Sequence, residues 1–195
     1  MKRYFSIVAA LLLLSSPSIN AQSDAGAIFL LISPGARAGG MGEAQVAVAN
    51  DAYASYWNPA GLAFQEGSEL AVMHVNWLPS LADDMYYEFL GFRRQFPALG
   101  TLGGHLIYLN LGEQVRMDEY AQYQGTFTSY MMAAAMSYST QLSPSSSFGM
   151  SAKLSYQHLV ELGTGSEKGK GTSTDFGFDL GYMKKGWLTP RLDMG

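Results

Sequence analysis

The sequence predicts an all-β chain that forms part of a transmembrane antiparallel β-barrel in an outer membrane. Three observations predict this fold class: an N-terminal export signal, a series of long segments in which apolar and polar residues alternate, and a low content of charge. Charged residues make up 14% of the 195 residues, and the net charge is -4. Globular proteins contain about a quarter charged residues. The composition therefore favours a wall between lipid and a lumen over a cytosolic enzyme.

Residues 1–21 have the pattern of a signal peptide. Lys2 and Arg3 give a positively charged start, residues 5–14 are apolar, and small residues lead to a cleavage position after Ala21. An apolar run of about ten residues is too short to span a bilayer as a helix. We therefore expect the mature protein to be exported.

Residues 22–66 form the second predicted region, an N-terminal hatch. The stretch 34–64 is dense in Gly and Ala and has few large aliphatic side chains. Such a segment cannot bury a core of its own, so it must pack closely against another part of the protein. We expect it to act as a plug, and we expect bulky replacements of Gly39 and Gly40 to disturb its seating.

Residues 67–195 are predicted to form the wall. The expected strands cover 69–77, 85–94, 101–111, 126–142, 148–162 and 172–184, and residues 192–194 could begin a seventh. In the last two of these strands, Met150 and Phe178 fall on one face, and Ser151 and Asp179 on the other. Apolar faces with Tyr or Phe near their ends are typical of a lipid-facing band, and small or polar faces are typical of a lumen.

The lengths of the connections predict an orientation. The turns near Phe96 and Pro144 are short, whereas 110–125 and 163–171 are longer and more polar. Outer-membrane barrels have short periplasmic turns and long external loops. The hatch is then expected at the periplasmic mouth. The alternative is a soluble antiparallel sandwich, but sandwich strands are usually about five or six residues long, and several of these segments are longer.

The strand count predicts an incomplete barrel. Single-chain bacterial barrels have an even number of strands, at least about eight, whereas this sequence provides six or seven. Open sheet edges are unfavourable in lipid. We therefore expect the chain to be the N-terminal portion of a larger barrel.

The sequence shows no catalytic, metal or cofactor pattern. There is no Cys, so disulfides, thiolate metal sites and a Cys nucleophile are excluded. His74, His105 and His158 each fall inside a predicted strand without metal-ligand spacing, and core or lumen packing is expected for all three. No G-x-S-x-G motif or phosphate loop is present, and no Lys/Arg cluster suits a nucleic-acid partner. The charged residues predicted to face the lumen are expected to form a polar ladder between strands: Lys153, Glu161, Asp175 and Asp179.

Three motifs follow one another in the hatch: GARAGGMG at 35–42, VAVAND at 46–51 and YWNPAGL at 56–62. With this order and spacing the chain resembles the PorV/PorQ family of outer-membrane proteins, and more broadly the FadL-type fatty-acid transporters. The hatch residues that match these motifs are Gly35, Arg37, Gly39, Gly40, Met41, Gly42, Asn58, Pro59, Ala60 and Gly61. Arg37 either pairs with a carboxylate or is solvated, and the sequence leaves both open.

The resemblance implies a barrel with the N-terminal segment folded inside it as a hatch. PorV-like proteins serve type IX secretion, so the implied partners are outer-membrane lipid, secreted cargo with a C-terminal signal domain, and other secretion-system subunits. FadL-like proteins instead move long-chain fatty acids or other hydrophobic small molecules past a movable hatch. Both functions remain open at the level of the sequence.

Overall fold

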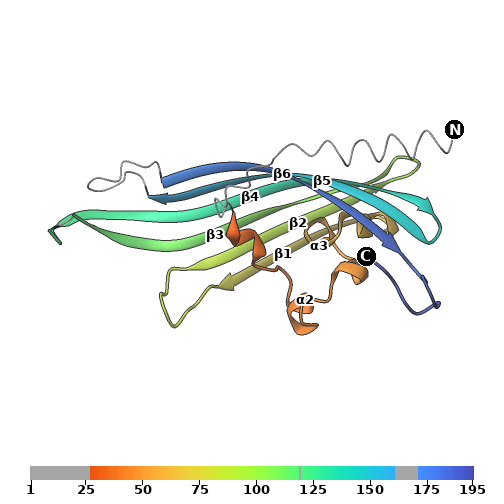
Figure 1. Cartoon of the computed structure of the whole chain (residues 1–195), viewed down its shortest axis with the longest axis horizontal. Helices are drawn as coiled ribbons and strands as arrows, with labels where there is room; N and C mark the ends of the chain where they lie inside the picture. The colour runs from red at the N-terminus through yellow and green to blue at the C-terminus, as the bar shows by residue number, and fades with distance from the viewer. Residues whose placement is uncertain (1–26, 119, 161–170) are drawn as a thin grey trace, which may run out of the picture.

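The computed structural model describes residues 27–118, 120–160 and 171–195. In this part of the chain, one antiparallel sheet carries a group of short helices against one of its faces (Figure 1). The predicted signal peptide 1–21 lies outside the described residues. No helix within the described ranges is long and apolar enough to cross a membrane.

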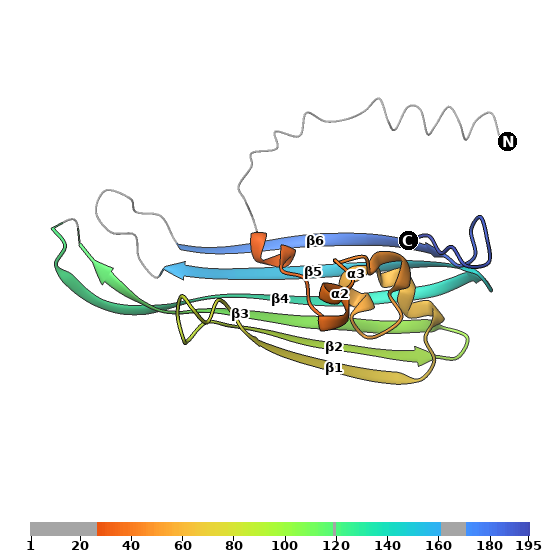
Figure 2. The same ribbon diagram turned by 90° about the horizontal axis from the view of Figure 1, so that it is seen from below.

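The sheet has six strands in sequential order, each antiparallel to the next (Figure 2). The strands are β1 (Ser68–Asn76), β2 (Tyr86–Phe96), β3 (Gly100–Met117), β4 (Tyr123–Ser143), β5 (Ser146–Val160) and β6 (Gly171–Lys184). Within the described residues β1 and β6 do not pair with each other, so the sheet is open. The predicted all-β antiparallel fold is confirmed, in the form of an unclosed barrel wall.

One expectation about the connections is wrong. Most of the predicted loop 110–125 is a hairpin, because Glu113 to Met117 of β3 pair with Tyr123 to Thr128 of β4 beyond a bulge. Its residues do not alternate in polarity, since neither face of this extension is covered. The possible seventh strand at 192–194 stays a prediction, and Met194 in it forms an isolated antiparallel bridge with Lys184 at the end of β6.

The outer face of the sheet, opposite the helices, is apolar. Its exposed side chains alternate with less exposed ones along much of each strand, as expected for a lipid-facing band. A row of tyrosines crosses four strands toward the long-hairpin end, with ring centroids 6.0, 5.9 and 6.2 Å apart: Tyr86, Tyr108, Tyr130 and Tyr156. This row has the composition of an aromatic girdle at a membrane interface.

Two of the three histidines belong to this outer row. The ring centroids of His74 and Tyr86 are 5.8 Å apart, and His158 stacks on Tyr130 with ring centroids 5.1 Å apart. The expectation of core or lumen packing is therefore wrong for both, because their positions in β1 and β5 have the parity of the outer face. Only His105 points inward, and it is 1% exposed.

The inner face, which carries the helices, has two parts. On β4 and β5 it is lined by small residues such as Ser137 and Ser151. On β2 and β3 it carries large buried side chains, including Phe89 and Ile107, which pack against Phe29 of the hatch. The predicted small or polar lining therefore holds only for the first part, because the hatch supplies an apolar partner for the second.

The hatch consists of five short helices placed near the short-turn end of the sheet (Figures 1 and 2). They are η1 (Ile28–Leu31), α2 (Ala36–Gly40), η2 (Val46–Val48), α3 (Ala54–Trp57) and η3 (Pro59–Phe64). None exceeds six residues. Helices this short are not stable alone, so their conformation depends on packing against the wall.

Candidate functional site: the hatch and its seat

Asn58 is the central anchor of the hatch. Its side-chain oxygen accepts a hydrogen bond from the Ala60 amide at 3.1 Å, which caps η3. Its side-chain nitrogen donates to the Val46 carbonyl at 3.1 Å and to the Tyr182 carbonyl at 3.2 Å. Pro59 follows at the first helical position, where its missing N–H leaves no bond unmade. One buried side chain thus joins two parts of the hatch to β6.

Two wall glycines make room for this anchor. A Cβ atom at Gly149 would lie under 3.0 Å from backbone atoms of Pro59 and Ala60, and one at Gly181 would lie under 3.0 Å from the Asn58 side-chain oxygen. Real Cβ atoms do not approach other atoms so closely. The seat of the Asn-Pro-Ala turn therefore requires glycine at both positions, on β5 and on β6.

Serine hydroxyls of the wall satisfy the carbonyl of the same turn. Ser147 donates to the Ala60 carbonyl at 2.7 Å, and Ser139 is 3.2 Å from the same oxygen. One turn further on, the Gln141 side chain donates to the Ala63 carbonyl at 3.1 Å. Burial against the wall removes these hatch carbonyls from water, and a buried carbonyl without a hydrogen bond is unfavourable. The bonds from the wall side chains therefore satisfy them.

Gly61 explains the compactness of the hatch itself. A Cβ there would lie under 3.0 Å from the Ala49 carbonyl oxygen. Residues 46–51 and 56–62, two of the three motifs, therefore pack backbone to backbone. Leu62 beside it is fully buried, and it forms a small core with Ala49, Ala60 and Met183 of β6.

A second anchor joins α3 to β3. The Ser55 hydroxyl lies 3.1 Å from Nδ1 of His105, and it also reaches the carbonyls of Ala52 at 3.1 Å and Gly104 at 3.3 Å. The Nε2 atom of His105 has no hydrogen-bond partner among the described residues.

Aromatic side chains hold η1 in place. The Tyr56 hydroxyl donates to the Leu30 carbonyl at 2.6 Å, and the Trp57 indole donates to the Pro34 carbonyl at 3.2 Å. Tyr53 stacks on Phe89 of β2 with ring centroids 4.8 Å apart. These aromatic residues of the hatch thus pack against the wall and against the first residues of the hatch itself.

Arg37 pairs with a carboxylate and is also partly solvated. Its guanidinium lies 3.5 Å from Asp51 and donates to the side chain of Asn50, while 48% of the side chain stays exposed. Burial raises the pKa of Asp51 above 3.8, although Arg37 acts in the opposite direction. Asp51 also accepts from the Tyr53 amide at 3.1 Å. The two sequence alternatives for Arg37 therefore both describe part of the observed state.

Most of the first motif lies away from the wall, although Gly35 at its start donates its amide hydrogen to Sδ of Met73 in β1 at 3.2 Å. Gly39, Gly40, Met41 and Gly42 are all exposed, and a Cβ at Gly39 or Gly40 would meet nothing within 4 Å. The expectation that bulky residues at Gly39 and Gly40 disturb seating has no support in this geometry. Gly42 has a φ of 62° and ends α2 in the left-handed region, where glycine is favoured.

The predicted polar ladder is represented by one ion pair. Lys153 of β5 lies 3.0 Å from Asp179 of β6, with side-chain exposures of 17% and 40%. Asp175 instead accepts a hydrogen bond from Ser173 at 3.1 Å. Glu161 lies outside the described residues. A ladder of four residues therefore remains a prediction, and the described part of it is a single cross-strand pair.

Sequence reasoning did not identify the wall half of this site. It missed Gly149, Gly181, Ser139, Ser147 and the contact between the inward-facing histidine and the hatch. Glycines inside otherwise regular strand patterns mark close backbone approach, so Gly149 and Gly181 carried a usable signal. The serines carried none, because small polar residues are expected everywhere along a lumen face.

These features define a class of protein: an outer-membrane type of β-sheet wall whose inner face holds a docked N-terminal hatch. A family model described as type IX secretion system protein PorV matches residues 19–186. The chain therefore belongs to the PorV family, and the predicted PorV/PorQ resemblance is confirmed. The comparison with curated proteins found no match.

Family membership makes this a protein associated with type IX secretion, and the wall fits an outer-membrane location. The similarity to FadL-type transporters and the expectation of a longer barrel stay predictions.

Proposed function

We propose that this protein is a non-enzymatic outer-membrane component of type IX secretion that receives exported cargo proteins. The observation that carries the proposal is a hatch bonded to the inner wall by Asn58, Ser147 and His105 in a chain of the PorV family. The docked hatch already occupies the inner face near the short-turn end (Figure 2). Cargo is therefore handled at a rim of the barrel.

The hairpin of β3 and β4 supplies a contact surface at one rim. It continues past the outer tyrosine row, and its exposed side chains include Val115, Met117 and Tyr123. Met117 and Tyr123 are direct cross-strand partners, and adjoining exposed apolar side chains mark protein–protein contacts. By the rule of short periplasmic turns, this rim faces the cell exterior. Cargo leaving the secretion machinery arrives on that side.

The test is a pull-down of the protein from cell envelopes. Wild-type protein should recover secreted proteins that carry the type IX C-terminal signal domain, and the double variant Val115→Ser/Tyr123→Ser should recover fewer. Gly177→Ala is a matched control, because a Cβ there meets nothing within 4 Å. Recovery of no such cargo by the wild type contradicts the proposal.

Uptake of hydrophobic small molecules is the second candidate. It is favoured by the apolar cluster between η1 and the inner face, where Phe29 packs against Tyr87 and Phe89. If this function holds, a deletion strain takes up long-chain fatty acids more slowly. Normal uptake of fatty acids in that strain, together with a secretion defect, supports cargo handling and contradicts the uptake function.

The Ser55–His105 contact is proposed to be structural. Ser55 is 1% exposed, and its hydroxyl is directed at backbone carbonyls, so no substrate carbonyl can reach it. A fluorophosphonate probe that labels active serine hydrolases should leave Ser55 unlabelled. Labelling at Ser55 would show a catalytic serine and contradict the non-enzymatic proposal.

A further inference from the structure

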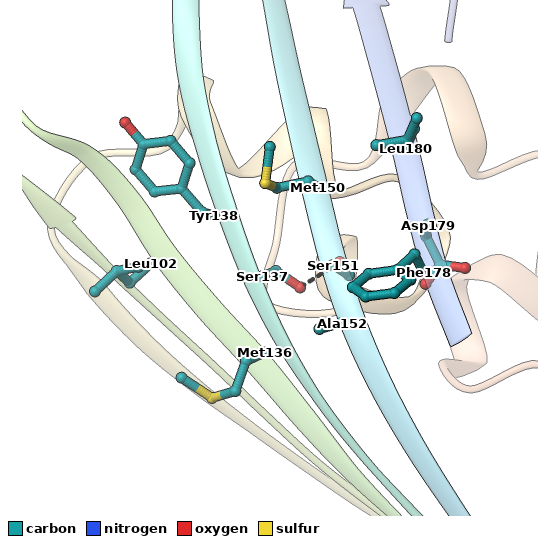
Figure 3. A pocket seen from close by; sticks show the side chains of 10 residues that line it. All are labelled: Leu102, Met136, Ser137, Tyr138, Met150, Ser151, Ala152, Phe178, Asp179 and Leu180. Carbon is teal, nitrogen blue, oxygen red and sulfur yellow. Dashed lines mark hydrogen bonds between the residues drawn. The ribbon is translucent and has the colours of Figure 1, made fainter. Parts of the chain in front are cut away.

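The outer face of the wall contains a hollow over Ala152 of β5. Its volume is about 350 Å³. Met136 of β4 and Phe178 of β6 are the direct cross-strand partners of Ala152, so a single methyl group stands between two large side chains. Figure 3 shows Ala152 between these two neighbours. The hollow exists because one small residue interrupts a row of large ones.

The hollow offers only apolar groups to a ligand. Ser137 and Ser151 also border it, but their hydroxyls bond to each other at 2.7 Å, as the dashed line in Figure 3 shows. Asp179 is paired with Lys153, and the Tyr138 hydroxyl donates to the Leu99 carbonyl at 2.6 Å. Unbranched Met136 and Met150 supply adaptable walls. The complementary ligand part is a flexible hydrocarbon chain.

The depth of the hollow fits one leaflet of a bilayer. Lys184 ends β6, six residues after Phe178 in the sequence, and shares its parity, so both belong to the outer face. At about 3.3 Å per residue this separation is about 20 Å along the strand. With a strand tilt of about 40°, it becomes about 15 Å of depth. Half of a hydrocarbon core is also about 15 Å.

A cation stands at the short-turn end of this path. Lys184 is partly exposed and takes part in no ion pair within the described residues. Tyr182, which is 41% exposed, lies between it and the hollow on the same face. An ammonium group with a neighbouring phenol at the interface is complementary in charge to a lipid phosphate. Short turns face the periplasm, so the lipid belongs to the periplasmic leaflet.

We propose that this outer groove is a discrete site for one glycerophospholipid. One acyl chain ends in the hollow over Ala152, and the headgroup phosphate contacts Lys184. The proposal rests on the outer-membrane location and is independent of cargo handling. A site of this kind fixes one lipid at the wall.

The first experiment removes the hollow. Full-length protein is extracted from membranes, washed in detergent, and its retained phospholipid is counted by native mass spectrometry. Wild type should keep one phospholipid, and Ala152→Phe should lose it. Val72→Phe is the control, because Val72 lies on the same outer face in β1 and is 71% exposed. Equal retention by the two variants, or equal loss, overturns the proposal.

The second experiment tests the headgroup contact and does not alter the hollow. Washed protein is titrated with phosphatidylglycerol, and binding is compared between Lys184→Gln and Lys185→Gln. Lys185 is the adjacent cation, but its ammonium lies 4.1 Å from the Phe64 ring centroid of the hatch. Lys184→Gln should weaken binding and Lys185→Gln should not. Equal binding by the two variants, or a tightly held protein in place of lipid, overturns the proposal.

Discussion

Gly181→Ala should release the hatch from the wall. A Cβ at this position would lie under 3.0 Å from the Asn58 side-chain oxygen, 3.0 Å from Cδ of Pro59 and 3.1 Å from the Ala60 amide nitrogen. The last two atoms belong to a buried turn and cannot move without moving η3. The added methyl group therefore displaces the Asn-Pro-Ala turn as a unit.

The size of the effect follows from the contacts that are lost. Overpacking of a tight site costs about 1–3 kcal/mol. Displacement of Asn58 also removes a helix cap, worth about 1 kcal/mol. The sum of about 2–4 kcal/mol corresponds to a shift of about 30- to 700-fold in the docking equilibrium, at 1.4 kcal/mol for each factor of ten.

Hydrogen exchange of the full-length protein measures this shift. The amides of Ala60 and Gly61 are bonded to Asn58 in the docked hatch, so they exchange when the hatch opens. Gly177→Ala is the matched control, since it makes the same change on the same strand where no atom lies within 4 Å. Equal exchange of residues 58–64 in both variants would refute the close-packing argument.

Three further predictions concern single interactions. Ser147→Ala should weaken hatch docking by about 1 kcal/mol, because the Ala60 carbonyl loses its shortest hydrogen bond; unchanged exchange of residues 58–64 would contradict this. Asp179→Ala should destabilise the protein by about 2 kcal/mol and Lys153→Met by less than about 1 kcal/mol, because the lysine is the more buried partner; thermal unfolding of both variants compares them, and the reverse order would contradict the reasoning. Burial raises the pKa of Asp51 above 3.8, so the folded form binds the proton more readily than the unfolded form. Docking should therefore weaken as the pH rises from 3.8 through the raised pKa. Hydrogen exchange of residues 58–64, measured against pH, should show this dependence in the wild type and lose it in Asp51→Asn.

The sequence was most informative where a regular pattern had a physical cause. Alternation with period two identified the strands and their outer face, because a sheet between lipid and a lined interior sorts side chains by parity. The same rule, applied strictly, places His74 and His158 outside. The expectation that they pack inside is wrong because both positions have the parity of the outer face, where the two rings join the tyrosine row.

The hairpin extension was not predictable in the same way. Residues 113–117 and 123–128 pair as strands although their composition is that of a loop. Both faces of this segment meet water, so no burial sorts its residues. The two strands simply continue there from the membrane part of β3 and β4, with a shift of register at the bulge between Asn110 and Glu113.

The hatch motifs divide according to what they touch. The sequence by itself determined that residues 34–64 cannot form a core, and it marked Asn58-Pro59-Ala60 as a turn. Only the tertiary structure decided that this turn, and not Gly39-Gly40, meets the wall. The glycines that allow the contact, Gly149 and Gly181, are about ninety or more positions away along the chain.

Sequence alone thus determined the class of the wall, the apolar chemistry of its outer face and the family, since these follow from local patterns that repeat or match in order. The tertiary structure decided how the hatch docks, which serine and histidine hold it, and where the outer face is hollow. These features depend on distances between strands, and a distance between strands is set by register and packing, which no single segment encodes.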